Sequence, residues 1–73
     1  MEEQYHEPVK EMSPAARDRA KAFKSLIEEI EAVDWYDQRC AVETDPELRE
    51  ILIHNRNEEI EHATMLLEWI RRK

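Results

Sequence analysis

The sequence predicts an all-α protein built on one antiparallel hairpin of two long helices. The chain has 73 residues with no glycine and three prolines, and 40% of them are charged, which favours helices over strands and turns. No helix breaker stands between Pro14 and Pro46, and none follows Pro46. Apolar residues recur at helical spacing on both sides of Pro46. We therefore expect a helical hairpin over residues 13–73, preceded by a polar arm of residues 1–12.

The arm and the first helix meet at Ser13. Residues 1–12 are polar, show no periodicity and are interrupted by Pro8. Ser13 supplies an N-cap hydroxyl, and Pro14 suits the first helical position, whose N–H has no intrahelical partner. We expect the first helix to run from about residue 14 to residue 42.

The second helix begins near residue 45, where two caps are possible. Asp45 precedes Pro46 as Ser13 precedes Pro14, and Thr44 with Glu47 would form a capping box instead. The helix continues to the C-terminal end, where three basic residues complement its negative dipole. Both alternatives give the same short turn and the same hairpin.

Charge and cysteine content limit the classes of function. The net charge of −7 disfavours binding to nucleic acid or to an anionic membrane and favours attraction of cations. The single cysteine, Cys40, excludes an internal disulfide and suits a reducing compartment. No apolar run reaches membrane length and residues 1–12 hold no signal-peptide core. Because two helices cannot enclose a core, we expect a soluble cytoplasmic chain that oligomerises.

Each helix carries a heptad-spaced apolar seam that is interrupted by polar residues. The interruptions that matter most are Glu29 in the first helix and Glu59 with His62 in the second. The seams read Ala22, Leu26, Glu29, Val33, Tyr36, Cys40 and Leu48, Leu52, Asn55, Glu59, His62, Leu66, Trp69. Apolar residues off the seams indicate contacts with more than one neighbour; they are Phe23, Ile27, Ile30, Ile51, Met65 and Ile70.

Glu29 and Glu59 are equidistant from residue 44, so a hairpin places both about 22 Å from the turn. His62 follows Glu59 by three residues and shares its helical face. Buried carboxylates are costly unless they are paired or bound to a metal, and a cation explains three such groups at one height. The alternative is a helical bundle whose polar seam residues only set the register, a role that suits Asn55.

One hairpin offers two carboxylates and one imidazole, too few for two metals. A twofold dimer would supply the four carboxylates and two imidazoles typical of di-iron sites in ferritin-like bundles. This ligand set suits Fe(II), Mn(II) or Zn(II). Tyr36, one heptad beyond Glu29, could hydrogen-bond a ligand carboxylate.

Two further clusters combine acidic groups with a histidine or a tryptophan. Taken alone, each is better explained as a solvated acidic face, although either could hold or attract cations. One cluster comprises Glu28, Glu31 and Trp35, and the other comprises His54, Glu58 and Glu61.

Two long segments resemble the encapsulated ferritins, SLIEEIEAVDWYDQR (residues 25–39) and LIHNRNEEIEHATMLLEWIRR (residues 52–72), as does the arm motif His6-Glu7-Pro8. The resemblance implies two-helix protomers that pair into a four-helix ferritin-like site. It further implies a ring of five dimers, a decamer, that oxidises Fe(II) inside an encapsulin shell in the cytoplasm. Members of that family continue into a further helix and an encapsulin-targeting tail, so shell targeting cannot be assigned to residues of this sequence. Cys40 is a departure from the family pattern.

Carried over by position, the resemblance implies ferroxidase ligands at Glu29, Glu59 and His62, with Tyr36 beside them. It implies two irons per dimer, and calcium, manganese or zinc in the same or secondary sites. It also assigns the two acidic clusters: Glu28, Glu31 and Trp35 as a metal-entry site, and His54, Glu58 and Glu61 as an outer-surface cation site. We therefore predict a ferroxidase that feeds iron storage. The alternatives are another di-metal oxidase or peroxidase, and a structural adaptor in which metal only locks the dimer.

Overall fold

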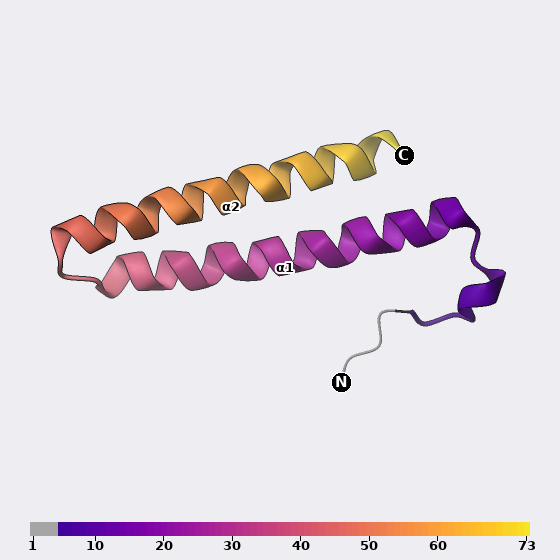
Figure 1. Ribbon diagram of the computed structural model, residues 1–73, viewed down its shortest axis with the longest axis horizontal. Helices are drawn as coiled ribbons and strands as arrows, with labels where there is room; N and C mark the ends of the chain where they lie inside the picture. The colour runs from indigo at the N-terminus through magenta and orange to yellow at the C-terminus, as the bar shows by residue number, and fades with distance from the viewer. Residues whose placement is uncertain (1–4) are drawn as a thin grey trace.

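The computed structural model describes residues 5–73 and consists mainly of two long antiparallel helices (Figure 1). A short 3-10 helix, η1 (Val9–Glu11), precedes α1 (Pro14–Val42), and α2 (Pro46–Arg72) follows the turn of residues 43–45. The all-α class and the helix bounds expected from the sequence are confirmed. The turn of 3-10 helix was not expected, and residues 1–4 of the arm lie outside the described residues.

Side-chain caps define where both long helices begin. Ser13 Oγ accepts the Ala16 N–H at 3.1 Å, as the Ser-Pro pair predicts. Asp45 Oδ2 accepts the Leu48 N–H at 2.7 Å, so Asp45 is the N-cap of α2 and the alternative cap at Thr44 is wrong. The Asp45 N–H in turn donates to Glu43 Oε2 at 3.0 Å. The turn is therefore held by carboxylates on either side of Thr44.

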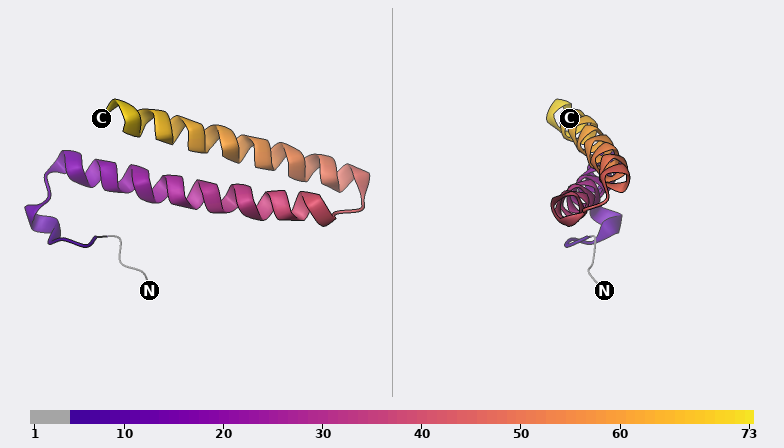
Figure 2. Two further views of the ribbon diagram at one scale, coloured as in Figure 1. Left: turned by 180° about the vertical axis from the view of Figure 1, so that it is seen from behind. Right: turned by 90° about the vertical axis from the view of Figure 1, so that its left-hand side faces the viewer.

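The two helices form a single thin layer rather than a closed core. The molecule measures 51 × 29 × 11 Å, and the end-on view shows one helix beside the other (Figure 2). Within residues 5–73, only Ala22 and Cys40 are buried, at 8% and 3% exposure. The other seam residues have a neighbour on one side only, so most of them are half-buried.

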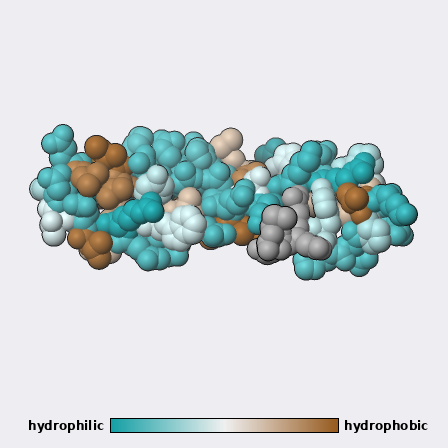
Figure 3. All heavy atoms as spheres, turned by 60° about the horizontal axis from the view of Figure 1, so that its bottom comes forward, coloured by the Kyte–Doolittle hydropathy of each residue, from teal (hydrophilic) through white to brown (hydrophobic). Residues whose placement is uncertain are grey.

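Large apolar side chains remain exposed on both helices. Five of the six expected off the seams are exposed, and Ile70 is half-buried instead. One face is mainly hydrophilic with separate hydrophobic patches, one of them near the end that carries the α1–α2 turn (Figure 3). Within residues 5–73, neither helix is long and apolar enough to cross a membrane. The exposed residues expected off the seams are Phe23, Ile27, Ile30, Ile51 and Met65.

Candidate metal centre

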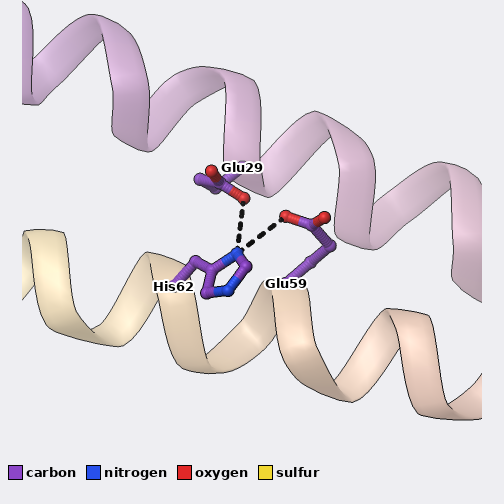
Figure 4. A group of neighbouring side chains, drawn as sticks. All are labelled: Glu29, Glu59 and His62. Carbon is purple, nitrogen blue, oxygen red and sulfur yellow. Dashed lines mark ion pairs between the residues drawn. The ribbon is translucent and has the colours of Figure 1, made fainter.

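Glu29, Glu59 and His62 meet between the two helices near the middle of the hairpin. His62 Nδ1 lies 3.5 Å from Glu29 Oε2 and 3.5 Å from Glu59 Oε2 (Figure 4). One ligand atom from each residue lies within 4.8 Å of the other two. In the described part of the chain, no other three histidine, cysteine or acidic side chains come together in this way. The sequence-predicted triad is thus the one that the fold assembles.

The hairpin geometry accounts for this meeting. Glu59 and His62 project from one face of α2 because three residues make nearly one helical turn. Glu29 projects from α1 toward the same space (Figure 4). The short turn of residues 43–45 fixes the heights of the two helices, as the equal distances from residue 44 predict.

The triad is open on one side. The side chains of Glu29 and Glu59 are 27% and 25% exposed, and that of His62 is 48% exposed. An apolar groove of about 400 Å³ begins at His62 and is lined further along α2 by Met65, Leu66 and Trp69. A metal at the triad would therefore have room for ligands that do not come from this hairpin.

Electrostatics in the triad favour either shared protons or a bound cation. The pKa of Glu29 is raised, first by a hydrogen bond with Glu59, then by burial and by the negative charge of Glu59, while His62 opposes the rise. Burial lowers the pKa of His62, but the attraction and hydrogen bonds of Glu29 and Glu59 outweigh it and raise the pKa overall. A divalent cation would replace these protons, since carboxylates and imidazole bind metals in their deprotonated forms.

Tyr36 lies on α1, one heptad beyond Glu29, and is half-buried. The guanidinium carbon of Arg39 lies 5.3 Å from the centre of its ring. No side-chain hydrogen bond among residues 5–73 joins Tyr36 to the triad. Its predicted role as a partner of a ligand carboxylate remains a prediction.

The two acidic clusters are arranged differently from the triad. Glu28, Glu31 and Trp35 line one hollow on α1, and Lys24 lines it with them. Sequence reasoning missed Lys24, although its position four residues before Glu28 places it on the same helical face.

On α2, His54 Nε2 lies 3.7 Å from Glu58 Oε1. Glu61 lines a separate groove that also holds Trp69 and Arg72. The cluster on α1 therefore shares one hollow, as predicted, whereas on α2 only His54 and Glu58 are paired.

Comparison with known proteins places the chain in a family. Residues 4–73 match the EncFtn-like family model. The chain is 58% identical over 72 residues to a "Ferritin-like protein" of Thermotoga maritima, covering 99% of this chain and 63% of the relative. It is 57% identical over 67 residues to an "Encapsulated ferritin-like protein" of Rhodospirillum rubrum, covering 92% of this chain and 48% of the relative. The chain thus spans less than two thirds of either relative's length.

A solved crystal structure supports the same assignment. A protein of Nitrosomonas europaea superposes with a TM-score of 0.85 at 59% identity, over 93% of this chain and 75% of that one. The helical hairpin and the long sequence matches agree with the resemblance inferred from the sequence. The chain belongs to the EncFtn-like family.

Proposed function

We propose that this chain is a subunit of a ferroxidase, which oxidises Fe(II) to Fe(III) with dioxygen at a site shared by two copies of the chain. The observation that carries the proposal is the triad of Glu29, Glu59 and His62, which presents two carboxylates and one imidazole within 4.8 Å of one another. Carboxylates with imidazole form the ligand set of di-iron proteins with helical bundles. The family relationship supports an iron-related role associated with an encapsulin.

A second copy of the chain completes the site in this proposal. One triad has too few ligands for two irons, and it is open toward an apolar groove that starts at His62. Two triads related by a twofold axis supply four carboxylates and two imidazoles, and pairing two hairpins produces a four-helix bundle. The large exposed apolar side chains on both helices provide surface for such contacts.

The chain's own residues have separable roles in the reaction. Glu29 and Glu59 bind iron as carboxylates and stabilise Fe(III) more than Fe(II), because the higher charge is attracted more strongly. His62 binds as a neutral imidazole, so its proton must leave when iron arrives. A pair of Fe(II) ions gives up two electrons, and dioxygen takes both with two protons and leaves as hydrogen peroxide. Tyr36 would hydrogen-bond a ligand carboxylate from beside the site.

In this proposal, carboxylates on the surface attract Fe(II) and deliver it to the triad. The hollow of Glu28, Glu31 and Trp35 would be the entry site, and His54, Glu58 and Glu61 would bind cations on the outer surface. An acidic patch raises the local concentration of cations, an effect that salt screens.

The oxidised iron would be stored by a partner. A hairpin one layer thick cannot by itself form the wall of a cage. We propose that dimers assemble into a ring of five within an encapsulin shell in the cytoplasm; the name of the Rhodospirillum rubrum relative, an encapsulated ferritin-like protein, supports the shell. Iron is the metal of the proposed reaction; calcium, manganese or zinc could occupy the same or secondary sites.

The proposal is tested by loading the protein with Fe(II) without oxygen and then admitting air. Native mass spectrometry should give two irons per dimer, and ferric absorbance should rise rapidly on exposure to air. Glu29→Ala should abolish the rapid phase, whereas Glu50→Ala removes an exposed carboxylate of α2 and should leave it unchanged. A wild-type rate in Glu29→Ala would overturn the assignment. Turnover of peroxide without oxidation of Fe(II) by dioxygen would identify a peroxidase instead.

A further inference from the structure

Two side-chain hydrogen bonds join α1 to α2 outside the triad, within residues 5–73. Near the turn, Arg49 Nε donates to the Cys40 carbonyl at 3.0 Å. Closer to the triad, Arg56 Nη1 donates to Asp37 Oδ1 at 2.9 Å, and this bond is also an ion pair. Neither Arg56 nor Asp37 belongs to the apolar seams, so their ion pair is an interaction between the helices separate from the seams.

The guanidinium of Arg56 is held at two points. Its Nη1 bridges to Asp37 on α1, while Nε and Nη2 lie 3.4 and 3.3 Å from Asn57 Oδ1 on its own helix. The Arg56 side chain is 28% exposed, so it lies against the protein rather than in solvent. A planar guanidinium bound on two edges has a defined direction, unlike the flexible ammonium of lysine.

The link lies closer to the proposed metal ligands along α2 than along α1. Arg56 precedes Glu59 by three residues and His62 by six, which correspond to rises of about 4.5 and 9 Å along α2. Asp37 follows Glu29 by eight residues, about 12 Å along α1. In residues 5–73, no side-chain hydrogen bond between the helices is nearer to the triad.

The apolar seam alone fixes the triad poorly. Apolar contact is not directional, and only Ala22 and Cys40 are buried within residues 5–73. A small rotation or slide of α2 would therefore cost little apolar burial, yet it would move Glu59 and His62 away from Glu29. A charge-assisted hydrogen bond between the helices resists such a movement because its geometry is directional.

We propose that Arg56, bound to Asp37 and oriented by Asn57, is a positioning residue that holds Glu59 and His62 opposite Glu29 before a metal arrives. The inference deepens the proposed function, on which it rests for the identity of the triad as a metal site. It assigns no contact between Arg56 and the metal. Arg56 acts only on the positions of Glu59 and His62 relative to Glu29.

The test compares two variants that remove the same charge from the same helix. Asp37→Asn weakens the link between the helices, whereas Asp34→Asn changes a residue whose hydrogen-bond partner, Gln38, lies on its own helix. Cobalt(II) serves as the metal probe, because its visible spectrum reports the ligand geometry. We expect Asp37→Asn to bind cobalt roughly two- to fivefold more weakly, the range that exposed ion pairs allow, and to alter the spectrum. Asp34→Asn should have the cobalt affinity and the cobalt spectrum of the parent protein.

A rescue variant and a metal-free measurement complete the experiment. Asp37→Arg combined with Arg56→Asp reverses the pair and should recover most of the lost affinity. In metal-free protein at fixed pH, the His62 ring resonances should shift in Asp37→Asn and stay in place in Asp34→Asn. Ring resonances and cobalt binding that are the same in both variants would overturn the inference. A parent protein that binds no cobalt, with His62 still shifted in Asp37→Asn, would overturn the metal assignment and leave the positioning role standing.

Discussion

His62 faces two carboxylates with a single ring nitrogen, so protons and cations compete for the same small space. The raised pKa values of His62 and Glu29 both favour the protonated forms in the folded, metal-free chain. A group whose pKa is higher in the folded chain than in the unfolded chain stabilises the fold. This stabilisation is fully present at pH values below the pKa of the unfolded chain, and it is lost as the pH rises through the pKa of the folded chain. A metal requires the deprotonated groups, so its affinity must change in the opposite direction with pH.

The first prediction concerns this pH dependence. Cobalt(II) affinity should rise as the pH passes the pKa values of Glu29 and His62, which lie above their ordinary values of 4.5 and 6.5. Over the same range, the metal-free protein should become less stable, because the stabilisation by the protonated triad is lost. Metal titrations and thermal unfolding at several pH values measure the two trends. In His62→Gln both trends should be flatter, and equally steep trends in that variant would contradict the prediction.

The second prediction concerns Lys24, which lines the hollow of Glu28, Glu31 and Trp35. A fixed positive charge there opposes the attraction of cations by the two carboxylates. Lys24→Gln should therefore speed the capture of Fe(II) at low ionic strength, and the gain should shrink in salt. Stopped-flow oxidation at two salt concentrations measures it. Lys21→Gln, which removes a lysine of α1 that is paired with Asp18, is the control and should give the smaller gain.

The triad could be predicted from the sequence because all three of its residues lie on the heptad seams. Spacing alone gives their heights once the turn is known. The link between Asp37 and Arg56 could not be predicted in the same way, because its members are 19 residues apart and lie off the seams. Many combinations of an acidic residue on one helix and a basic residue on the other are possible ion pairs in this chain. Only the rotation of each helix about its axis selects the pair that forms.

At the scale of the elements, capping residues explain why both helices begin where they do. The Ser-Pro and Asp-Pro pairs mark both starts in the sequence, and Ser13 and Asp45 accept the hydrogen bonds expected of N-caps. Sequence left Thr44 and Asp45 as alternatives because both side chains can accept from a backbone N–H. The choice depends on which residue the turn places at the cap position, and that is a property of the folded chain.

The third prediction separates these two residues. Asp45→Ala should lower the free energy of unfolding by about 1 kcal/mol, the usual cost of losing an N-cap. Thr44→Ala should change it by less than about 0.5 kcal/mol, since Thr44 does not cap α2. Thermal unfolding followed by circular dichroism, at one protein concentration, measures both. Equal effects of the two substitutions would argue for shared capping.

At the scale of the whole molecule, the hairpin is a single layer that leaves large apolar side chains exposed on both helices. The sequence predicted two helices with apolar residues off the seams, and five of those residues are exposed; the expected oligomer remains a prediction. The arrangement of partners cannot be read in the same way, because many contacts between copies could cover these residues. In the proposed dimer, four carboxylates would face one another without a cation, and their repulsion would oppose pairing.

The fourth prediction follows from that repulsion. Protein stripped of metal with a chelator should elute later from a sizing column than protein loaded with Fe(II) under nitrogen. In Glu29→Ala the metal-free form should assemble more readily than metal-free parent protein, because two of the four facing carboxylates are gone. An elution volume that does not respond to chelation would contradict a metal site between subunits.

The single-layer form of the hairpin, with Ala22 and Cys40 as the buried residues of positions 5–73, has a consequence for the safety of iron chemistry in a cell. If the site is shared by two copies, as proposed, a newly made chain that has not met another copy carries half of the reaction centre. In that proposal, such a chain would present one triad and could not supply both of the electrons that dioxygen takes. Oxidation would then begin only above a threshold abundance, which ties the release of peroxide to the completion of the assembly that disposes of the product.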